Sequence, residues 1–291
     1  KKLSLREIPS VDEIIIHFQQ LVITIPYALC IKNIRKTLNS IRKEIRHGLI
    51  KENIRKYAFR QIEVNLIQAS NSNMTSVING TGIILHTGLG RAPISLELIK
   101  KAMDNVYPYT NLEFDLEVGK RGERNDHVID LINVLTGSEA AVVVNNNAAA
   151  VLLMLNTLSE GKEVIISRGE QVEIGGSFRI PDVILKSGCK MLEIGTTNKT
   201  HLKDYQDAIN SNTGAIMVAH TSNYKVIGFT HSVDLSDLGK LARKKRIPLI
   251  VDLGCGALAD FQDLSLPEEP TVLSYIKSAA GVYSFSGDKL L

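Results

Sequence analysis

The chain has 291 residues with a net charge of +3, and 44% of its residues are hydrophobic, which suffices for about two domains with a substantial core. No apolar run reaches the roughly 18 residues of a membrane helix and no secretory signal opens the chain, so we expect a cytosolic α/β protein. Cys30, Cys189 and Cys255 are far apart and form no CxxC pair, which argues against a disulfide framework or a zinc site.

The N-terminal quarter carries the positive charge. Residues 1–70 have a balance of +7, whereas the rest of the chain has −4. Apolar residues recur at three- and four-residue steps between Ile31 and Leu49, which predicts an amphipathic helix with a basic outer face. Such a face is typical of phosphate-backbone binding, although a merely solvated helix face is the alternative. The candidate nucleic-acid contacts are Lys32, Arg35, Lys36, Arg42, Lys43 and Arg46.

Two further helical patterns accompany the basic helix. One covers residues 8–30 and is broken at Pro26, and the other covers residues 54–69. The polar, turn-prone run at residues 70–73 ends this part of the chain. The sequence therefore predicts a small helical domain and linker at residues 1–73 and a second domain at residues 74–291.

Four glycines lie between Asn79 and Arg91. Their spacing matches neither a GxGxxG fingerprint nor a Walker loop. We interpret them as positions where the backbone approaches a ligand or a second subunit, with Arg91 as an anion-binding side chain. Tight turns alone are the alternative explanation, and His86 is interpreted as a packed residue.

From residue 140 onward, short β-branched runs alternate with helical patterns. This alternation predicts a mainly parallel sheet with helices on both faces, and ligands of such sheets bind outside the carboxyl ends of the strands. The predicted strands are residues 140–144, 163–167, 191–194, 215–219, 249–252 and 281–285, and the predicted helices are residues 127–135, 148–158, 202–210 and 234–246.

Functional groups follow several of these predicted strands. Residues 145–147 are three asparagines at a helix start, where backbone N–H groups bind phosphate. Asp252 ends one strand, Ser222 follows another, and Ser286 and Lys289 follow the last. Pyridoxal phosphate needs this combination, because a lysine forms its Schiff base and an acid keeps its ring nitrogen protonated. Each feature alone has an ordinary explanation as a turn, a helix cap or a solvated lysine.

Longer motifs are more specific than this general pattern. They are NGTGIILHTGLGR at residues 79–91, KRG at 120–122, VNNNAA at 144–149, SRGEQVEIGGSFRIP at 167–181, GTTN at 195–198, HTSNY at 220–224, VDLG at 251–254 and FSGDK at 285–289. Together they resemble the bacterial selenocysteine synthase family, the L-seryl-tRNA(Sec) selenium transferases, and the likeness extends over residues 3–291.

The resemblance implies a fold-type-I pyridoxal-phosphate enzyme, a cytosolic ring-shaped homodecamer built from dimers, and an N-terminal domain that binds selenocysteine tRNA through the basic helix. It implies that Lys289 forms the Schiff base, that Asp288 is catalytic, that Asp252 faces the pyridine nitrogen and that Arg91 holds the anionic selenium donor. The expected cofactor contacts are Lys289, Asp252, Asn146, Asn147, Ala148, Ser222 and Ser286.

The implied reaction converts seryl-tRNA(Sec) to selenocysteinyl-tRNA(Sec) with selenophosphate, through a pyridoxal-phosphate aldimine and a dehydroalanyl-tRNA intermediate. Two alternatives stay open: a related pyridoxal-phosphate lyase acting on a small amino acid or amino-sugar acid, and a truncated, non-catalytic tRNA-binding protein. The chain departs from the family in two ways. It ends two residues after Lys289, where the family continues into a smaller C-terminal domain, and it has no evident aromatic residue to stack on the cofactor ring, a place that Gln171 or a neighbour would take.

Overall fold

A computed structural model describes residues 5–50, 52–72, 74–174, 178–221, 224–260, 270–279 and 281–289. The chain divides into two compact units, Lys1–Ile78 and Asn79–Leu291. The first unit ends a few residues after residue 73, the boundary that the sequence predicts. Among the described residues, no helix combines the length and apolar character needed to cross a membrane.

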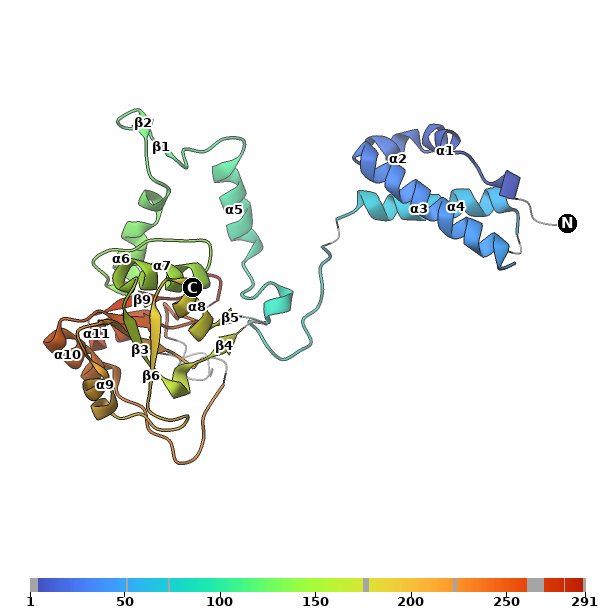
Figure 1. The fold of residues 1–291 in the computed structure, drawn as a ribbon. Coiled ribbons are helices and arrows are strands. Elements are labelled where there is room, and N and C mark those ends of the chain that lie inside the picture. The colour runs from blue at the N-terminus through green and yellow to red at the C-terminus, as the bar shows by residue number, and fades with distance from the viewer. Residues whose placement is uncertain are drawn as a thin grey trace. The chain divides into compact units, whose positions relative to one another are not determined.

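The first unit is a small set of packed helices, drawn in blue in Figure 1. Ser10 and Asn53 begin two of them, because their side chains accept a hydrogen bond from the backbone N–H three residues later. Pro26 immediately precedes the longest helix. The elements are η1 (Leu5–Glu7), α1 (Val11–His17), α2 (Gln19–Ile23), α3 (Tyr27–Arg46) and α4 (Ile54–Ser70).

The core of this unit lies along the facing sides of α3 and α4. Ile34 and Leu38 of α3 are fully buried in one cluster with Ile62 and Leu66 of α4. Because these residues recur at helical spacing on one side, the charged residues of α3 lie on its opposite, exposed side. The periodicity of the sequence thus predicted both the helix and its orientation.

The second unit is built on a five-stranded sheet with the strand order β6-β3-β7-β8-β9. Figure 1 labels β3, β6 and β9 of this sheet. Every neighbouring pair in it is parallel. The predicted parallel sheet is therefore confirmed. Its strands are β3 (Glu163–Ser167), β6 (Lys190–Ile194), β7 (Thr213–Ala219), β8 (Leu249–Asp252) and β9 (Val282–Ser284).

Helices bury both faces of the sheet, and successive residues of each strand point to opposite faces. Ile166 and Met217 pack with α7 and α8, whereas Ile165 and Ile216 pack with α9, α10 and α11. This two-sided burial explains why the strands are nearly continuous apolar runs. The helices are α7 (Asn147–Ser159), α8 (Ile180–Lys186), α9 (Leu202–Ala208), α10 (Leu235–Lys245) and α11 (Val272–Ser278).

Residues 140–144 correct one prediction, because they do not form a strand. Their β-branched composition favours an extended chain, but a strand also needs a neighbour to complete its hydrogen bonds. Within the described residues no strand pairs with this run, and Val142 and Val143 are 58% and 52% exposed. The amide of Val143 instead donates to Asn125 Oδ1.

Residues 79–145, the first part of the second unit, bury little of their apolar surface. Helix α5 was not predicted, and none of its residues is buried, although Leu96, Leu98 and Met103 are apolar. The remaining elements are η2 (Thr87–Leu89), α5 (Leu96–Val106), β1 (Phe114–Asp115), β2 (Lys120–Arg121), η3 (Arg124–His127), α6 (Ile129–Thr136), η4 (Arg168–Glu170), β4 (Glu173–Ile174) and β5 (Phe178–Arg179).

Candidate active site

The carboxyl edge of the sheet brings three strand ends into line. In the strand register, Ala219 of β7 lies opposite Asp252 of β8, which lies opposite Ser284 of β9. The backbone N–H of His220 donates to the carbonyl of Asp252 at 2.8 Å, so the connection continues just past the strands. Ligands of open α/β sheets bind at this kind of edge.

Asp252 is the central acid of this edge and is only 3% exposed. Its Oδ1 accepts hydrogen bonds from Asn147 Nδ2 at 2.7 Å, from the Gly254 backbone N–H at 3.0 Å and from Ser284 Oγ at 3.4 Å. Burial raises the pKa of Asp252, and these donors together with the charge of Lys289 act against that rise. The acid is thus surrounded by neutral donors, with one cation nearby.

Gly254 connects this acid to Lys289. Its N–H donates to Asp252, while its carbonyl accepts from Lys289 Nζ at 3.3 Å and from the Ser286 backbone N–H at 3.1 Å. The φ angle of Gly254 is +68°, a left-handed conformation that strongly favours glycine. Lys289 and Asp252 therefore both contact Gly254 at the same edge of the sheet.

The start of α7 provides unsatisfied polar groups beside Asp252. The side chain of Asn146 accepts from the backbone N–H of Ala149 at 2.9 Å and so caps the helix. Within the described chain, the backbone N–H groups of Asn147 and Ala148 have no acceptor, and Asn147 Oδ1 is buried without a hydrogen-bond partner. Because buried polar groups are nearly always paired, the N–H groups are suited to an anionic group of a ligand and Asn147 Oδ1 to a hydrogen-bond donor.

Arg91 and Asp288 form an ion pair although they are far apart in the sequence. Arg91 Nη1 lies 2.5 Å from Asp288 Oδ2, and the backbone N–H of Ala92 donates to the carbonyl of Asp288 at 3.3 Å. Arg91 has a φ angle of +62°, which is uncommon for a residue with a side chain. The structure therefore holds the predicted anion-binding arginine against the residue next to Lys289.

Among the predicted residues, Ser222 lies outside the described residues, so its place at the site stays a prediction. Gln171 donates from Nε2 to Glu193 of β6, so its amide is already engaged. The six basic residues assigned to RNA binding are all exposed on α3, and none forms an ion pair with a carboxylate of the described chain.

Sequence reasoning missed the role of Gly254 and the position of Glu170. Glu170 ends η4, directly after β3, and its Oε2 accepts from the backbone N–H of Ala219 at 3.4 Å. Burial raises the pKa of this carboxyl to about 8. The sequence could have indicated this role, because Glu170 follows a predicted strand, as Lys289 follows the last one.

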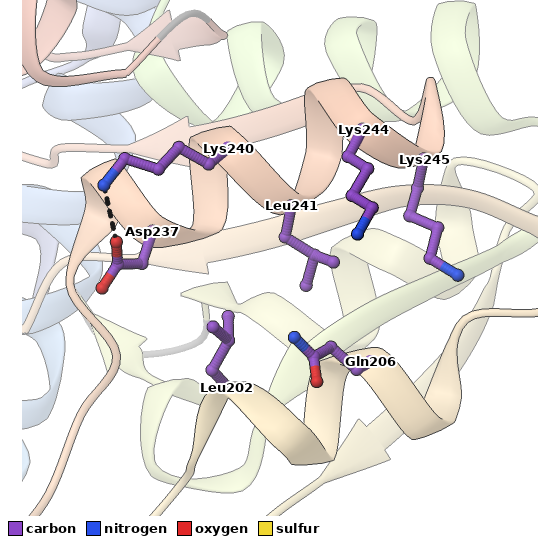
Figure 2. Close-up of a pocket in the computed structure, with 7 residues that line it drawn as sticks. All are labelled: Leu202, Gln206, Asp237, Lys240, Leu241, Lys244 and Lys245. Carbon is purple, nitrogen blue, oxygen red and sulfur yellow. Dashed lines mark hydrogen bonds and ion pairs between the residues drawn. The ribbon is translucent and has the colours of Figure 1, made fainter.

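A separate hollow between α9 and α10 is not part of this site (Figure 2). Lys244 and Lys245 line it in the last turn of α10, which leads into the amino end of β8, whereas Asp252 is at the carboxyl end. Lys240 is paired with Asp237 at 2.9 Å. Cations in a last helical turn stabilise the helix dipole, which accounts for these lysines.

Comparison with known proteins decides the family. Residues 77–291 match the family described as "SelA: L-seryl-tRNA selenium transferase". The chain belongs to the L-seryl-tRNA selenium transferase family. The "L-seryl-tRNA(Sec) selenium transferase" of Alkaliphilus oremlandii (strain OhILAs) is 46% identical over 291 residues, which cover 98% of this chain and 62% of the relative. That of Carboxydothermus hydrogenoformans is also 46% identical, over 99% of this chain and 62% of the relative.

This member of the selenium transferase family thus spans 62% of the length of those relatives. Among solved structures, "Structure of D-Glucosaminate-6-phosphate Ammonia-lyase" matches with a TM-score of 0.55 and 17% identity, covering 70% of this chain and 52% of that chain. The likeness shows the fold, which is fold type I of the pyridoxal-phosphate enzymes. The predicted family and fold are both confirmed.

Proposed function

We propose that the protein converts seryl-tRNA(Sec) to selenocysteinyl-tRNA(Sec), with selenophosphate as the selenium donor. The observation that carries this proposal is the arrangement of Asp252, Gly254 and Lys289 at the carboxyl edge of the sheet, in a chain that belongs to the selenium transferase family. Membership of the family supports these substrates, and the carboxyl edge of the sheet is the site where we expect them to react.

The residues at this edge fit pyridoxal phosphate. Asn147 Oδ1 is a buried polar atom without a partner, and the free N–H groups of Asn147 and Ala148 open a helix of 13 residues. We infer that these N–H groups hold the phosphate, with Asn146 fixing the helix start and Ser222 and Ser286 adding further contacts. Asp252 supplies the anion that a protonated ring nitrogen requires, since a buried carboxylate needs a cationic partner.

Lys289 is the residue we assign to covalent attachment and to proton transfer. When bound, pyridoxal phosphate supplies an electron-withdrawing ring that stabilises negative charge on the substrate's α-carbon. Nζ of Lys289 would hold the cofactor covalently, and its amine would take the proton from the α-carbon of the seryl group. Its contact with the Gly254 carbonyl orients Nζ toward the side of the site where Asp252 lies.

Arg91 and Asp288 are assigned to the selenium donor. The guanidinium of Arg91 carries two or more N–H groups in one plane and so suits the phosphate oxygens of selenophosphate. Asp288 holds that guanidinium in place at 2.5 Å. Because Asp288 directly precedes Lys289 in the chain, donor binding at Arg91 and proton transfer at Lys289 take place close together.

We assign the tRNA to the basic face of α3 and propose that the enzyme works as a dimer-based ring, a homodecamer, in the cytoplasm. The six exposed cations of α3 without carboxylate partners support the first assignment. The exposed apolar residues of α5 support the second, since Leu96, Leu98 and Met103 are each at least 60% exposed and need a cover.

The test supplies the full chain with pyridoxal phosphate, seryl-tRNA(Sec) and selenophosphate. We expect selenocysteinyl-tRNA(Sec) as the product, identified by mass spectrometry of the released amino acid. A protein that binds both the cofactor and the tRNA, yet releases the three-carbon unit without adding selenium, would be a lyase, and the proposal would be wrong. A protein that binds tRNA but no cofactor would be a non-catalytic RNA-binding protein.

A further inference from the structure

The side chain of Glu170 accepts a hydrogen bond from β7 at a point where β3 offers no backbone acceptor. The last pair between β3 and β7 joins Ile166 to Met217, and the next residue, Ser167, pairs only with Ile194 of β6. Two residues beyond Met217, the backbone N–H of Ala219 donates to Glu170 Oε2 at 3.4 Å instead of to a backbone carbonyl. The side chain of Glu170 thus replaces the next acceptor of the ladder.

The neighbouring Gly169 makes a second contact with the chain that follows β7. Its carbonyl accepts from Tyr224 Oη at 2.7 Å. A side chain at Gly169 would meet the carbonyl of Thr197 at 2.9 Å, so this turn packs closely and has little freedom to shift. Residues 169 and 170 therefore form hydrogen bonds with Ala219, the last residue of β7, and with Tyr224, which follows this strand.

These contacts adjoin the candidate active site. Ala219 lies opposite Asp252, and the N–H of the next residue, His220, donates to the Asp252 carbonyl at 2.8 Å. A shift of Ala219 would therefore move the strand end that holds Asp252. We propose that Glu170 is a positioning residue, which fixes the end of β7 and so holds the backbone of Asp252 in place.

Among the described residues, no cation contributes to the pKa of Glu170, so none keeps it ionised. Tyr205 of α9 and Tyr224 face it, and its carboxyl is among the causes that raise the pKa of both hydroxyls. Arg168 is the nearest basic residue in the chain, and its guanidinium pairs with Glu193. Burial raises the pKa of Glu170 to about 8, so near neutral pH it acts as an uncharged acceptor. Ionisation above that pH strengthens the hydrogen bond, because the Ala219 N–H favours the charged carboxylate.

The experiment measures amide hydrogen exchange of peptides covering residues 215–221 in the full chain, at pH 7 and pH 9, corrected for intrinsic rates. Glu170→Ala removes the acceptor, so we expect Ala219 to exchange about tenfold faster at pH 7. Glu170→Gln keeps an uncharged acceptor and should stay close to wild type. Wild type should gain protection at pH 9, where the ionised carboxylate is the stronger acceptor, whereas Glu170→Gln should not.

The matched control is Glu163→Gln, at the other end of β3, where the carboxylate accepts from Asn210 Nδ2 at 2.8 Å. It should leave the exchange of Ala219 unchanged at both pH values. As a second readout, the Kd for pyridoxal phosphate should rise about fivefold in Glu170→Ala, in line with the loss of one hydrogen bond, and stay flat in Glu170→Gln.

Two results would overturn the inference: wild-type exchange and wild-type Kd in Glu170→Ala, or the same pH dependence in Glu170→Gln as in wild type. The second comparison decides even if Glu170→Ala fails to fold. The inference relies on the proposed function only in taking this edge as the active site. Because the exchange measurement uses neither cofactor nor tRNA, it can succeed where selenium transfer fails, and the reverse.

Discussion

The edge around Asp252 and the outer face of α3 are both candidate functional surfaces, but they use opposite physics. Asp252 is 3% exposed and has three hydrogen-bond donors in fixed positions. The cations of α3 are exposed and none has a carboxylate partner in the described chain. At the edge, a small displacement of one atom breaks several hydrogen bonds, whereas on α3 each charge contributes a small, independent amount to the binding free energy.

This difference predicts how each surface responds to change. Removing one group from a buried, connected site leaves its partners unpaired, so the loss is large and independent of salt. Removing one charge from a solvated face weakens binding by a small factor, and the loss shrinks as salt rises. The substitutions below test this contrast, from the largest expected effect to the smallest.

Lys289→Ala should have the largest effect. Without Nζ the chain has no group for covalent attachment at this edge, so the visible absorption band of lysine-bound cofactor should be absent. Activity should fall by about 10³-fold or more, because both attachment and proton transfer are lost. Lys277→Ala, an exposed lysine at the end of α11, is the control and should match wild type. A Lys289→Ala protein that keeps the band would contradict the site assignment.

Asp252→Asn should come next, at about 10²-fold lower kcat. The amide keeps the size of the carboxyl and can still accept from Gly254 and Ser284, but it carries no charge for a protonated ring nitrogen. Cofactor should therefore still bind, so the measured contrast is between a lowered kcat and a nearly unchanged amount of bound cofactor. Equal activity of Asp252→Asn and wild type would exclude this acid from the mechanism.

The pH dependence of stability offers a third test at the same residue. Burial raises the pKa of Asp252 above its unfolded value near 3.8, so the folded state binds this proton more tightly. The free energy of unfolding should therefore fall as pH rises from about 4 through the folded-state pKa. In Asp252→Asn this part of the slope should disappear. Denaturant unfolding of the cofactor-free chain at several pH values measures it.

The sequence predicted the edge better than the region around residues 79–145. Alternating strands and helices are local patterns, and parallel strands place their carboxyl ends together, so Asp252 and Lys289 could be assigned to one place before any coordinates. Helix α5 and the unpaired run at residues 140–144 could not be predicted in the same way. Their apolar residues are exposed in the described chain, so what they pack against is not encoded in their own pattern.

The contacts that cross the sequence were also beyond prediction. The Arg91–Asp288 pair joins residues that no periodicity relates. The bond from Ala219 to Glu170 forms where the pairing of β3 with β7 has stopped, two residues before β7 ends. Gly254 was recognised only as a glycine after a strand. Its bridging role depends on a φ angle of +68° and on where Lys289 returns to the site. Such details arise from the packed chain and not from local residue preferences.

On α3, three substitutions together should give a moderate effect. Neutralising Lys36, Arg42 and Lys43 with alanine should weaken the binding of serylated selenocysteine tRNA by about tenfold at low salt. The slope of log Kd against log salt should fall by about two units, because binding releases fewer counterions when fewer phosphates are contacted. Cofactor binding should not change. An unchanged slope would show that the RNA does not contact this face.

A single substitution on the same face should give the smallest effect, and a paired arginine provides its control. Arg42 bonds only to the neutral Asn39 at 2.6 Å, whereas Arg60 of α4 is paired with Glu52 at 2.5 Å. Arg42→Ala should therefore raise the Kd for tRNA by about two- to threefold, and Arg60→Ala should leave it near wild type, because Glu52 already offsets that charge. Filter binding of the full chain at 50 mM and 200 mM salt would measure both, with the Arg42→Ala effect smaller at the higher salt. A loss in Arg42→Ala of a hundredfold that salt does not reduce would mean that this arginine sits in a buried contact with the RNA, and the contrast between the two surfaces would not hold.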